Sequence, residues 1–350
     1  MQPKQDAEPV IRERVSVVAT VYNEAGSIDR LILSLAAQSR QPDELVIVDG
    51  GSEDGTLARL EAWANGEIRL PGGGAFEGLR VVSAPGANIS AGRNRAIAAA
   101  SGPLIAVTDA GVRLAPDWLE AITRPFDQGA RAVSGFFVSD PEGAFETALG
   151  ASSLPSVGEI DPARFLPSSR SVAFRKADWT AIGGYPEWLD YCEDLVFDLR
   201  LIHRTGQPRF APEALAGFRP RPDLAAFGRQ YYRYARGDGK AGLWPLRHAI
   251  RYLTYLLLAP GLAWLALRQH PLAWLGLVGG LAAMLRRPLL RLPGQWAALS
   301  PGERLQALAW LPPIRVTGDL AKMAGYPVGL AWRLRHRPPD WRPRAGDGPR

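Results

Sequence analysis

The 350-residue chain has a single cysteine, Cys192, and four histidines, at positions 203, 248, 270 and 336. One cysteine excludes an intrachain disulfide framework and a cysteine-rich zinc site, and it fits a reducing compartment. The histidines lie too far apart in the sequence to have metal-ligand spacing. Two glycine-rich phosphate loops are also missing. No Gly-x-Gly-x-x-Gly follows the first apolar strand, and no Gly-Lys-Ser/Thr follows the glycines at 72–74.

The first 14 residues lack the apolar run of an export signal, and they are polar throughout. We therefore expect a polar tail at 1–14, followed by a domain that stays in the cytoplasm.

Acidic residues are scarce in the last third of the chain. Residues 247–350 carry 15 basic and 4 acidic side chains, whereas residues 1–246 carry 26 and 31. Seven of the eleven tryptophans lie beyond position 240. This division indicates two parts in different surroundings rather than one uniform soluble domain. A content of 47% hydrophobic and 22% charged residues excludes a wholly disordered chain.

The first part alternates apolar β-branched runs with helical patterns. Strands are predicted at 15–20, 44–48, 79–82 and 104–108, with helices at 27–38, 52–65 and 90–100. Repeated strand–helix–strand units predict an α/β fold with a doubly wound, mostly parallel, Rossmann-like sheet. Ligands bind beyond the carboxyl ends of such strands. Polar and acidic residues gather at those ends, at 20–24, 49–51, 85–90 and 109–111.

The middle of the chain is less regular. Strands are predicted at 132–138 and 171–174 and helices at 177–182 and 193–203, and the segment 141–165 is loop-rich with an ambiguous helix.

Two charge-free stretches follow, of 16 residues at 252–267 and 15 residues at 271–285. Each would span roughly 22–24 Å as a helix, somewhat short of a hydrocarbon core of ~30 Å. They indicate a short membrane hairpin, although two buried core helices have the same composition. Arginines and a lysine flank the pair on both sides, and one arginine lies in the turn, so both ends are expected in the cytoplasm.

Four separated segments carry the functional signal. They are 18–24 (Val-Ala-Thr-Val-Tyr-Asn-Glu), 47–56 (Ile-Val-Asp-Gly-Gly-Ser-Glu-Asp-Gly-Thr), 91–94 with 108–111 (Ala-Gly-Arg-Asn and Thr-Asp-Ala-Gly), and 192–195 (Cys-Glu-Asp-Leu). In this order and at these strand ends, the chain resembles the family 2 glycosyltransferases of the membrane-anchored bacterial type, over about residues 15–222. The resemblance implies a GT-A fold, a nucleotide-sugar donor, a divalent cation (Mg²⁺ or Mn²⁺) and inversion at the anomeric carbon.

The resemblance also suggests domain boundaries. A GT-A catalytic domain is expected at 15–222, a juxtamembrane amphipathic segment at 223–248, and a transmembrane hairpin at 249–286. Residues 287–350 form a basic interfacial segment and tail, in which 306–334 also allows a third span. The Pro- and Arg-rich residues 336–350 are predicted to be disordered and to contact anionic lipid. No nucleic-acid-binding motif accompanies them, so nucleic acid is not an expected partner.

Donor-binding residues are expected on the first two strand ends. Thr20, Tyr22 and Glu24 leave the first strand at the rim, where a tyrosine ring can flank a base and a carboxylate can accept bonds from a base or a ribose. Asn23 and Glu24 can equally just begin the helix. Asp49 ends the second strand, where acidic residues hold ribose in other doubly wound sheets, and the resemblance assigns it to the nucleoside site.

Arg93 and Asp109 are expected on the diphosphate side of the donor. The family places an arginine at the position of Arg93, although a solvated surface arginine is the plain alternative. Asp109 begins Asp-Ala-Gly where the family usually has Asp-x-Asp. One carboxylate is therefore missing, but Asp109 together with the donor diphosphate still offers oxygen ligands to Mg²⁺ or Mn²⁺.

Glu193 and Asp194 open a predicted helix. An inverting transferase needs a base that takes the proton of the acceptor hydroxyl. By resemblance Asp194 is that base and Glu193 supports it, and a helix N-terminus favours the charged carboxylate. An ordinary acidic pair at a helix start is the alternative.

The segment 230–234 (Gln-Tyr-Tyr-Arg-Tyr) resembles the Gln-x-x-Arg-Trp element of processive members of the family. Through Gln230, Arg233 and Arg236 it is expected to cover the acceptor or hold the leaving diphosphate. A juxtamembrane amphipathic helix explains the same residues equally well.

Together these features predict an inverting glycosyltransferase at the inner (plasma) membrane, with its catalytic domain in the cytoplasm. Its partners would be a nucleotide-sugar donor, membrane lipid, and a lipid-linked or cell-envelope glycan acceptor. Two alternatives remain: a processive polysaccharide synthase subunit, and a degenerate sugar-nucleotide-binding scaffold of a membrane assembly complex.

Overall fold

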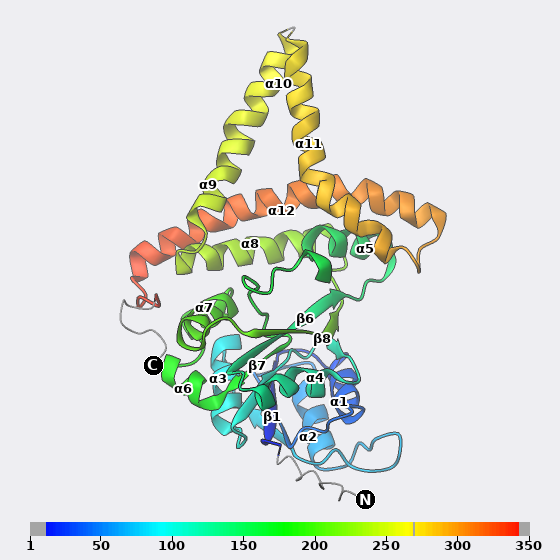
Figure 1. Cartoon of the computed structure of the whole chain (residues 1–350), viewed down its shortest axis with the longest axis vertical. Coiled ribbons are helices and arrows are strands. Elements are labelled where there is room, and N and C mark those ends of the chain that lie inside the picture. The colour runs from blue at the N-terminus through cyan, green and yellow to red at the C-terminus, as the bar shows by residue number, and fades with distance from the viewer. Residues whose placement is uncertain (1–11, 269, 343–350) are drawn as a thin grey trace, which may run out of the picture.

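A computed structural model describes residues 12–268 and 270–342. The chain forms three stacked parts: a sheet domain, a layer of long helices above it, and a helical hairpin that projects from this layer (Figure 1). Both charge-rich termini reach beyond the described residues. Residues 1–11 of the polar tail predicted at 1–14, and residues 343–350 of the predicted basic tail, therefore lie outside them.

Within the described residues the sheet has eight strands, in the order β3-β2-β1-β4-β7-β6-β8-β5. Their bounds are β1 Val15–Val21, β2 Glu44–Asp49, β3 Leu79–Ser83, β4 Leu104–Val107, β5 Val112–Leu114, β6 Ala132–Ser139, β7 Val172–Arg175 and β8 Arg209–Phe218. The strands β1 to β4 pair in parallel, as predicted.

Helices cover both faces of the sheet because successive strand residues point to opposite sides. In β1, Val17 and Ala19 pack in one core with α1 (Ile28–Ala36), α2 (Thr56–Ala64) and α4 (Trp118–Thr123). Val18 packs in the other, which includes α3 (Ile89–Ala99), α6 (Lys176–Ile182) and α7 (Glu193–Thr205). The predicted doubly wound α/β architecture is confirmed.

The far half of the sheet is mixed rather than parallel. β7 runs antiparallel to β4, with Val107 opposite Val172, and β6 and β5 also make antiparallel pairs. The sequence did not predict β8, because its residues Arg-Phe-Ala-Pro-Glu-Ala-Leu-Ala-Gly-Phe include no β-branched side chain. The antiparallel direction of β7 matters most here, since it brings the start of that strand to the carboxyl end of β4.

The helical layer above the sheet contains α5 (Gly143–Ser153), α8 (Leu224–Ala241) and α12 (Pro301–His336). Glycine permits a close approach of α8 and α12. A Cβ atom on Gly239 would lie 2.3 Å from the Tyr326 carbonyl oxygen, and one on Gly325 would lie 2.2 Å from that of Tyr232. Residues 306–334, all within α12, pack along α8.

The hairpin consists of α9 (Pro245–Leu253), a π-helical turn at Thr254–Leu258, α10 (Ala259–Leu267) and α11 (Pro271–Arg291). Short 3-10 turns occur at Arg124–Gln128, Val157–Glu159 and Leu292–Gln295. In the described chain, two helical stretches are long and apolar enough to cross a membrane, Pro245–Leu267 with 23 residues and Pro271–Gln295 with 25.

These stretches are longer than the charge-free segments, because each helix continues past charged residues at its foot. At ~1.5 Å per residue they reach roughly 35 Å, enough for a hydrocarbon core. Their leucines face outwards: Leu267 is 75% exposed and Leu272 is 77% exposed. The alternative of two buried core helices is therefore wrong.

The end of the described chain is more ordered than expected. Instead of a disordered tail beginning at His336, that residue ends α12, and the Trp341 indole N–H donates to the Ala241 carbonyl at 2.8 Å. Burying an indole beside its hydrogen-bond acceptor anchors this segment against the end of α8.

Candidate active site

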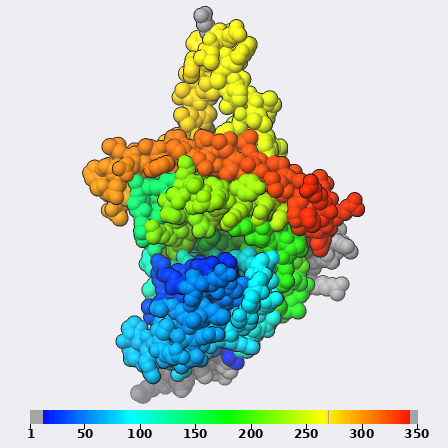
Figure 2. Space-filling model, turned by 180° about the vertical axis from the view of Figure 1, so that it is seen from behind, coloured from blue at the N-terminus to red at the C-terminus, as the bar shows by residue number. Residues whose placement is uncertain are grey.

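A cavity of about 1380 Å³ lies between the carboxyl rim of β1, β2 and β4 and the helix α8 above it. From behind, a recess separates the α8 layer from the sheet domain (Figure 2). Of the predicted site residues, those that line the cavity are Thr20, Tyr22, Glu24, Arg93, Asp109, Glu193, Asp194, Gln230 and Arg233. Asp49 and Arg236 are not among its lining residues.

The loop after β1 is held in shape by the loop after β2. The Asn23 side-chain oxygen accepts the Glu53 backbone N–H at 2.9 Å, and the Asn23 N–H donates to the Ser52 hydroxyl at 2.8 Å. Asn23 has a positive φ of 56°, a conformation that asparagine tolerates better than most residues. This turn leaves the Tyr22 ring 60% exposed at the cavity edge.

Glu24 lines the cavity but already has a partner. Its carboxylate accepts the Ser27 hydroxyl, and its backbone N–H donates to the Thr56 hydroxyl at 2.8 Å. The Ser27 hydroxyl, at the start of α1, accepts no backbone N–H of that helix. Part of the Glu24 carboxylate is used locally, so a contact with the donor stays a prediction.

Asp49 lies beneath the rim instead of on it. It is fully buried, and its Oδ1 accepts the backbone N–H groups of Gly51 and Ser52, each at 2.9 Å. Its Oδ2 is buried without a hydrogen-bond partner in the described chain. In this conformation Asp49 shapes the loop after β2, and its predicted contact with a nucleoside stays a prediction that needs the loop to open.

Helix α3 approaches β1 closely enough to place Arg93 beneath the cavity. A Cβ on Gly92 would lie 2.8 Å from the Thr20 Cγ2, so only glycine fits at that position without a shift. The Asn88 side chain caps the helix by accepting the Ala91 N–H at 2.9 Å. Its amide also donates to the Glu187 carbonyl at 2.7 Å, which ties α3 to the segment leading into α7.

Arg93 connects the predicted metal ligand to the predicted catalytic pair. Its Nη1 donates to Glu193 Oε1 at 2.6 Å and its Nη2 to Asp109 Oδ1 at 2.8 Å, and its side chain is only 3% exposed. Burial by itself would lower the pKa of Arg93, but the two carboxylates outweigh it and raise this pKa above its usual value. Arg93 is thus no free surface arginine, and both carboxylates already share its charge.

The same buried environment favours the neutral form of Glu193, whereas it keeps Arg93 charged. Burial and the neighbouring Asp194 raise the pKa of Glu193 to about 7 against the pull of Arg93. One turn further along α7, Asp198 is fully buried with both carboxyl oxygens unpartnered in the described chain. Burial, followed by repulsion from Asp194, raises the pKa of Asp198 well above its usual value.

Asp194 faces the cavity from the N-terminus of α7. Its Oδ1 accepts the Leu195 backbone N–H at 2.9 Å, as expected for a carboxylate at a helix start. Cys192, with a positive φ of 62°, turns the chain into the helix, and its thiol donates to the Tyr234 carbonyl at 3.1 Å. Gly237 lets α8 lie directly on this turn, since a Cβ there would be 2.5 Å from the Tyr191 carbonyl oxygen.

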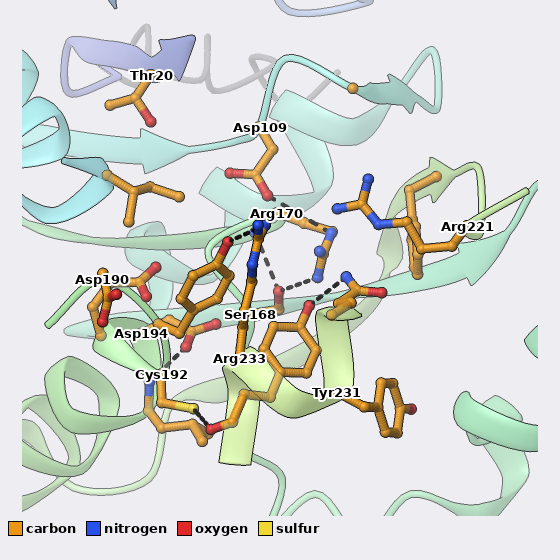
Figure 3. Close-up of a pocket in the computed structure, with 18 of the residues that line it drawn as sticks. Thr20, Asp109, Ser168, Arg170, Asp190, Cys192, Asp194, Arg221, Tyr231 and Arg233 are labelled. Atoms are coloured by element: carbon orange, nitrogen blue, oxygen red, sulfur yellow. Dashed lines mark hydrogen bonds and ion pairs between the residues drawn. The ribbon is translucent and has the colours of Figure 1, made fainter. Parts of the chain in front are cut away.

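A second arginine faces Asp109 across the cavity. Arg170 Nε lies 3.7 Å from Asp109 Oδ2, and Arg170 Nη1 donates to the Ser168 hydroxyl at 3.2 Å. Figure 3 shows Thr20, Asp109, Arg170 and Asp194 arranged around one cavity. Sequence reasoning missed Arg170 because the direction of β7 is not visible in the sequence. The available signal was its position directly before a predicted strand.

The metal prediction fits these residues only in part. The described residues contain no group of three or more His, Cys, Asp or Glu side chains that could hold a metal ion. Asp109 offers one carboxylate, and guanidinium groups face both of its oxygens. A cation would therefore take Asp109 as its protein ligand, and the remaining oxygens would come from the donor diphosphate and water.

The three residues of α8 that were expected to contact the acceptor or diphosphate differ in their surroundings. Gln230 Nε2 donates to the Tyr234 hydroxyl at 2.8 Å, and Arg233 Nη1 donates to the Tyr191 hydroxyl at 3.1 Å. Both side chains line the cavity. Arg236 instead forms an ion pair with Asp190, which also pairs with a lysine of the next helical turn. A direct contact of Arg236 with diphosphate therefore stays a prediction.

Residues 16–174 match the sequence model of the family described as glycosyl transferase family 2. A curated relative, the cholesterol galactosyltransferase of Borreliella burgdorferi, is 25% identical over 113 residues, which cover 32% of this chain. The match spans only 29% of the length of that relative.

Solved structures share the fold. The mannosyltransferase PcManGT of Pyrobaculum calidifontis, solved with GDP-Man and Mn²⁺, matches with a TM-score of 0.52 and 19% identity, over 96% of this chain and 91% of the other. S. aureus TarS 1–349 with UDP matches at a TM-score of 0.46 and 18% identity, over 87% of this chain and 90% of the other. Residues 16–174 thus match a glycosyl transferase family 2 domain, and the chain as a whole shares the GT-A fold of the mannosyltransferase structure.

Proposed function

We propose that the chain transfers a sugar from a nucleotide-diphosphate sugar to a hydroxyl of a lipid-linked or cell-envelope glycan, with inversion at the anomeric carbon. The observation that supports this most strongly is the convergence of Asp109, Arg170 and Asp194 on one cavity. Two positive groups lie on the side of Asp109, and a carboxylate at a helix start faces them from α7.

Asp194 is the general base in this proposal. It takes the proton of the acceptor hydroxyl while that oxygen bonds to C1 of the sugar. The bond between C1 and the diphosphate oxygen breaks on the opposite face, and its electron pair leaves with the nucleotide. Arg93 holds the two sides of the site together, because it pairs with Glu193, the neighbour of the base, and with Asp109 on the diphosphate side.

Positive charge around the leaving group stabilises the diphosphate as its negative charge grows. Arg170 and Arg233 line the cavity and supply that charge from the turn before β7 and from α8. A bound Mg²⁺ or Mn²⁺ at Asp109 would add charge neutralisation at the same diphosphate.

Membrane attachment supports a lipid-linked acceptor. The cavity extends to α9, the first helix of the exposed apolar hairpin. With the hairpin in the inner membrane and the arginine-rich foot at its cytoplasmic surface, the sheet domain would lie in the cytoplasm.

The test is Asp194→Asn in the purified full-length chain. Transfer, measured as sugar added to extracted lipid-linked acceptor, should fall about 10²–10⁴-fold, as expected when a general base is lost. Donor affinity, measured by calorimetry, should stay within about twofold. Asp127→Asn, on an exposed turn away from the cavity, is the matched control and should leave both values unchanged. Full turnover in the Asp194→Asn variant would remove the base assignment.

Two other functions predict different outcomes. A binding scaffold would bind the nucleotide sugar without transfer or hydrolysis in the native chain, and the paired state of Asp109 is the observation that favours this alternative. A processive synthase would add many sugars to one primer, so the product length on a defined primer separates it from single addition.

A further inference from the structure

The wall of the cavity also includes residues at the foot of the hairpin. There its wall is formed by Arg247, His248 and Arg251 of α9, by Lys322 of α12 and by Asp238 of α8, which lies beside His248. The foot of α9 adjoins α12 where the apolar hairpin leaves the helical layer (Figure 1). Positive charge at the foot of the hairpin is not accounted for by the sugar transfer proposed above.

Lys322 is the least satisfied of these groups. Its side chain is partly buried, and within the described residues no carboxylate pairs with its ammonium group and no hydrogen bond is made by it. The near neighbour is the ring of Tyr231, with Nζ 4.6 Å from the ring centroid. A partly buried ammonium group that faces a cavity is costly unless an anion or water solvates it.

The charges around Lys322 favour an anionic ligand over a neutral one. Arg251 Nε donates to Asp319 Oδ1 at 2.7 Å, so the one carboxylate of this face of α12 is already used. Burial, followed by repulsion from Arg251, lowers the pKa of Lys322 to about 8, which leaves it charged at neutral pH. Arg315 also repels Lys322, whereas Asp319 and Asp238 attract it without forming an ion pair with it in the described chain.

His248 does not add a competing charge. It is 3% exposed, accepts from Arg251 Nη1 at Nδ1 over 3.2 Å, and lies 3.2 Å from Asp238 through Nε2. Because Nδ1 accepts, the neutral tautomer places its proton on Nε2, towards Asp238. Arg251 is therefore held in place from two sides. Arg247 is exposed and stacks on the Trp244 ring, with its guanidinium carbon 4.3 Å from the ring centroid, and its donors are free to reach a ligand.

We propose that Lys322, Arg251 and Arg247 form a binding site for the phosphate of a lipid-linked acceptor, at the foot of the hairpin in the wall of the catalytic cavity. This inference rests on the proposed function, since it names the class of acceptor that the base serves. The lipid chain would run along the apolar hairpin, and the headgroup would extend through the cavity towards Asp194.

Two features select a lipid phosphate over a soluble anion. The site opens at the start of a helix whose leucines face outwards, such as Leu256, which is 61% exposed, so a hydrocarbon chain and a phosphate can be bound side by side. Arginine and lysine donors together match the geometry of phosphate oxygens, the arginine in a fork and the lysine as a point charge.

The test measures binding to the full-length chain in detergent micelles. Undecaprenyl monophosphate is the probe, and undecaprenol, inorganic phosphate and phosphatidylglycerol are compared with it by thermophoresis. The native chain should bind the monophosphate at least about tenfold more tightly than each of the other three. Lys322→Gln should weaken binding of the monophosphate about tenfold, the effect of losing one charge-assisted contact. Arg335→Gln, an exposed position on the same helix, is the matched control.

The outcomes separate this inference from the proposed function. Equal binding of undecaprenol, or no effect of Lys322→Gln, would overturn the phosphate site. Equal binding of phosphatidylglycerol would identify a general headgroup site and overturn the acceptor assignment, and equal binding of inorganic phosphate would overturn the lipid assignment. Nucleotide affinity is measured on the same samples. If the native chain binds no nucleotide, the proposed function fails, whereas intact nucleotide binding with no preference for lipid phosphate removes only this site.

Discussion

Two parts of the cavity wall hold their positive charge in different ways. Near the sheet, Arg93 is almost fully buried between Asp109 and Glu193. At the foot of the hairpin, Lys322 and Arg247 have no carboxylate partner in the described residues. Buried charges need partners within the protein, whereas charges at a binding surface keep their donors for a ligand. On this basis we propose that Arg93 organises the site, whereas the cations at the foot of the hairpin bind an anionic ligand.

The largest expected effect on stability comes from removing the charge of Arg93, which is paired with two carboxylates. Arg93→Met should lower the free energy of unfolding by about 3–5 kcal/mol, because two carboxylates lose their partner. Arg247→Met, at an exposed position, should change it by less than about 1 kcal/mol. Urea unfolding of the two variants in the same detergent measures both values. Equal losses would show that the two parts of the cavity wall do not differ in this way.

The next largest effect on stability is expected at the close contact between α8 and α12. Gly325→Ala places a Cβ where 2.2 Å separates it from the Tyr232 carbonyl oxygen, so α8 and α12 must move apart. We expect a loss of about 1–3 kcal/mol in the free energy of unfolding. Gly279→Ala on α11, where a Cβ meets nothing within 4 Å, should be neutral or slightly stabilising. Thermal unfolding of both variants provides the measurement, and a neutral Gly325→Ala would contradict the close packing.

The pH dependence of stability should report Glu193. Its pKa is raised to about 7 in the folded chain from an ordinary 4.5, mainly by burial. A raised carboxyl pKa favours folding in acid, and this contribution is lost as the pH rises from about 4.5 through about 7. The native chain should therefore lose stability over this range relative to Glu193→Gln. Glu61→Gln, at an exposed position, should keep the native profile, and parallel profiles for all three proteins would contradict the raised pKa.

The smallest expected signal concerns the metal. With a single carboxylate available, Mn²⁺ alone should give no measurable heat in calorimetry, and binding should appear only when GDP or UDP is present. Asp109→Asn should remove this nucleotide-dependent binding. Tight binding of Mn²⁺ without nucleotide, or unchanged binding in the variant, would place the metal elsewhere.

Much of the sheet domain was predictable because its signals are local. Short apolar strands such as 15–20 and 104–108, separated by amphipathic helices, determined the parallel half of the sheet and the rim on which Thr20 and Asp109 lie. The same periodicity cannot report strand direction. The antiparallel β7 and the alanine-rich β8 were therefore missed, and Arg170 with them.

The order of charges in the sequence also says nothing about which of them pair. Arg93, Asp109 and Glu193 were each expected in the site, but their joining into one ion-pair chain depends on α3, β4 and α7 meeting in space. For Asp49 the local prediction was correct, but the tertiary structure changed its surroundings. Its position at a strand end was predicted correctly, yet the loop that follows turns back and covers it.

By itself the sequence determined the α/β class of the first part, the glycosyltransferase motifs and an apolar pair of helices bounded by basic residues. These depend on residue patterns a few positions long, which act through local backbone preference and the burial of apolar side chains. Only the tertiary structure decided that Arg170 faces Asp109, that Arg93 is neutralised within the protein, and that Lys322 is not. Those outcomes depend on distances between residues far apart in the chain, and pairing energies change steeply over a few ångströms.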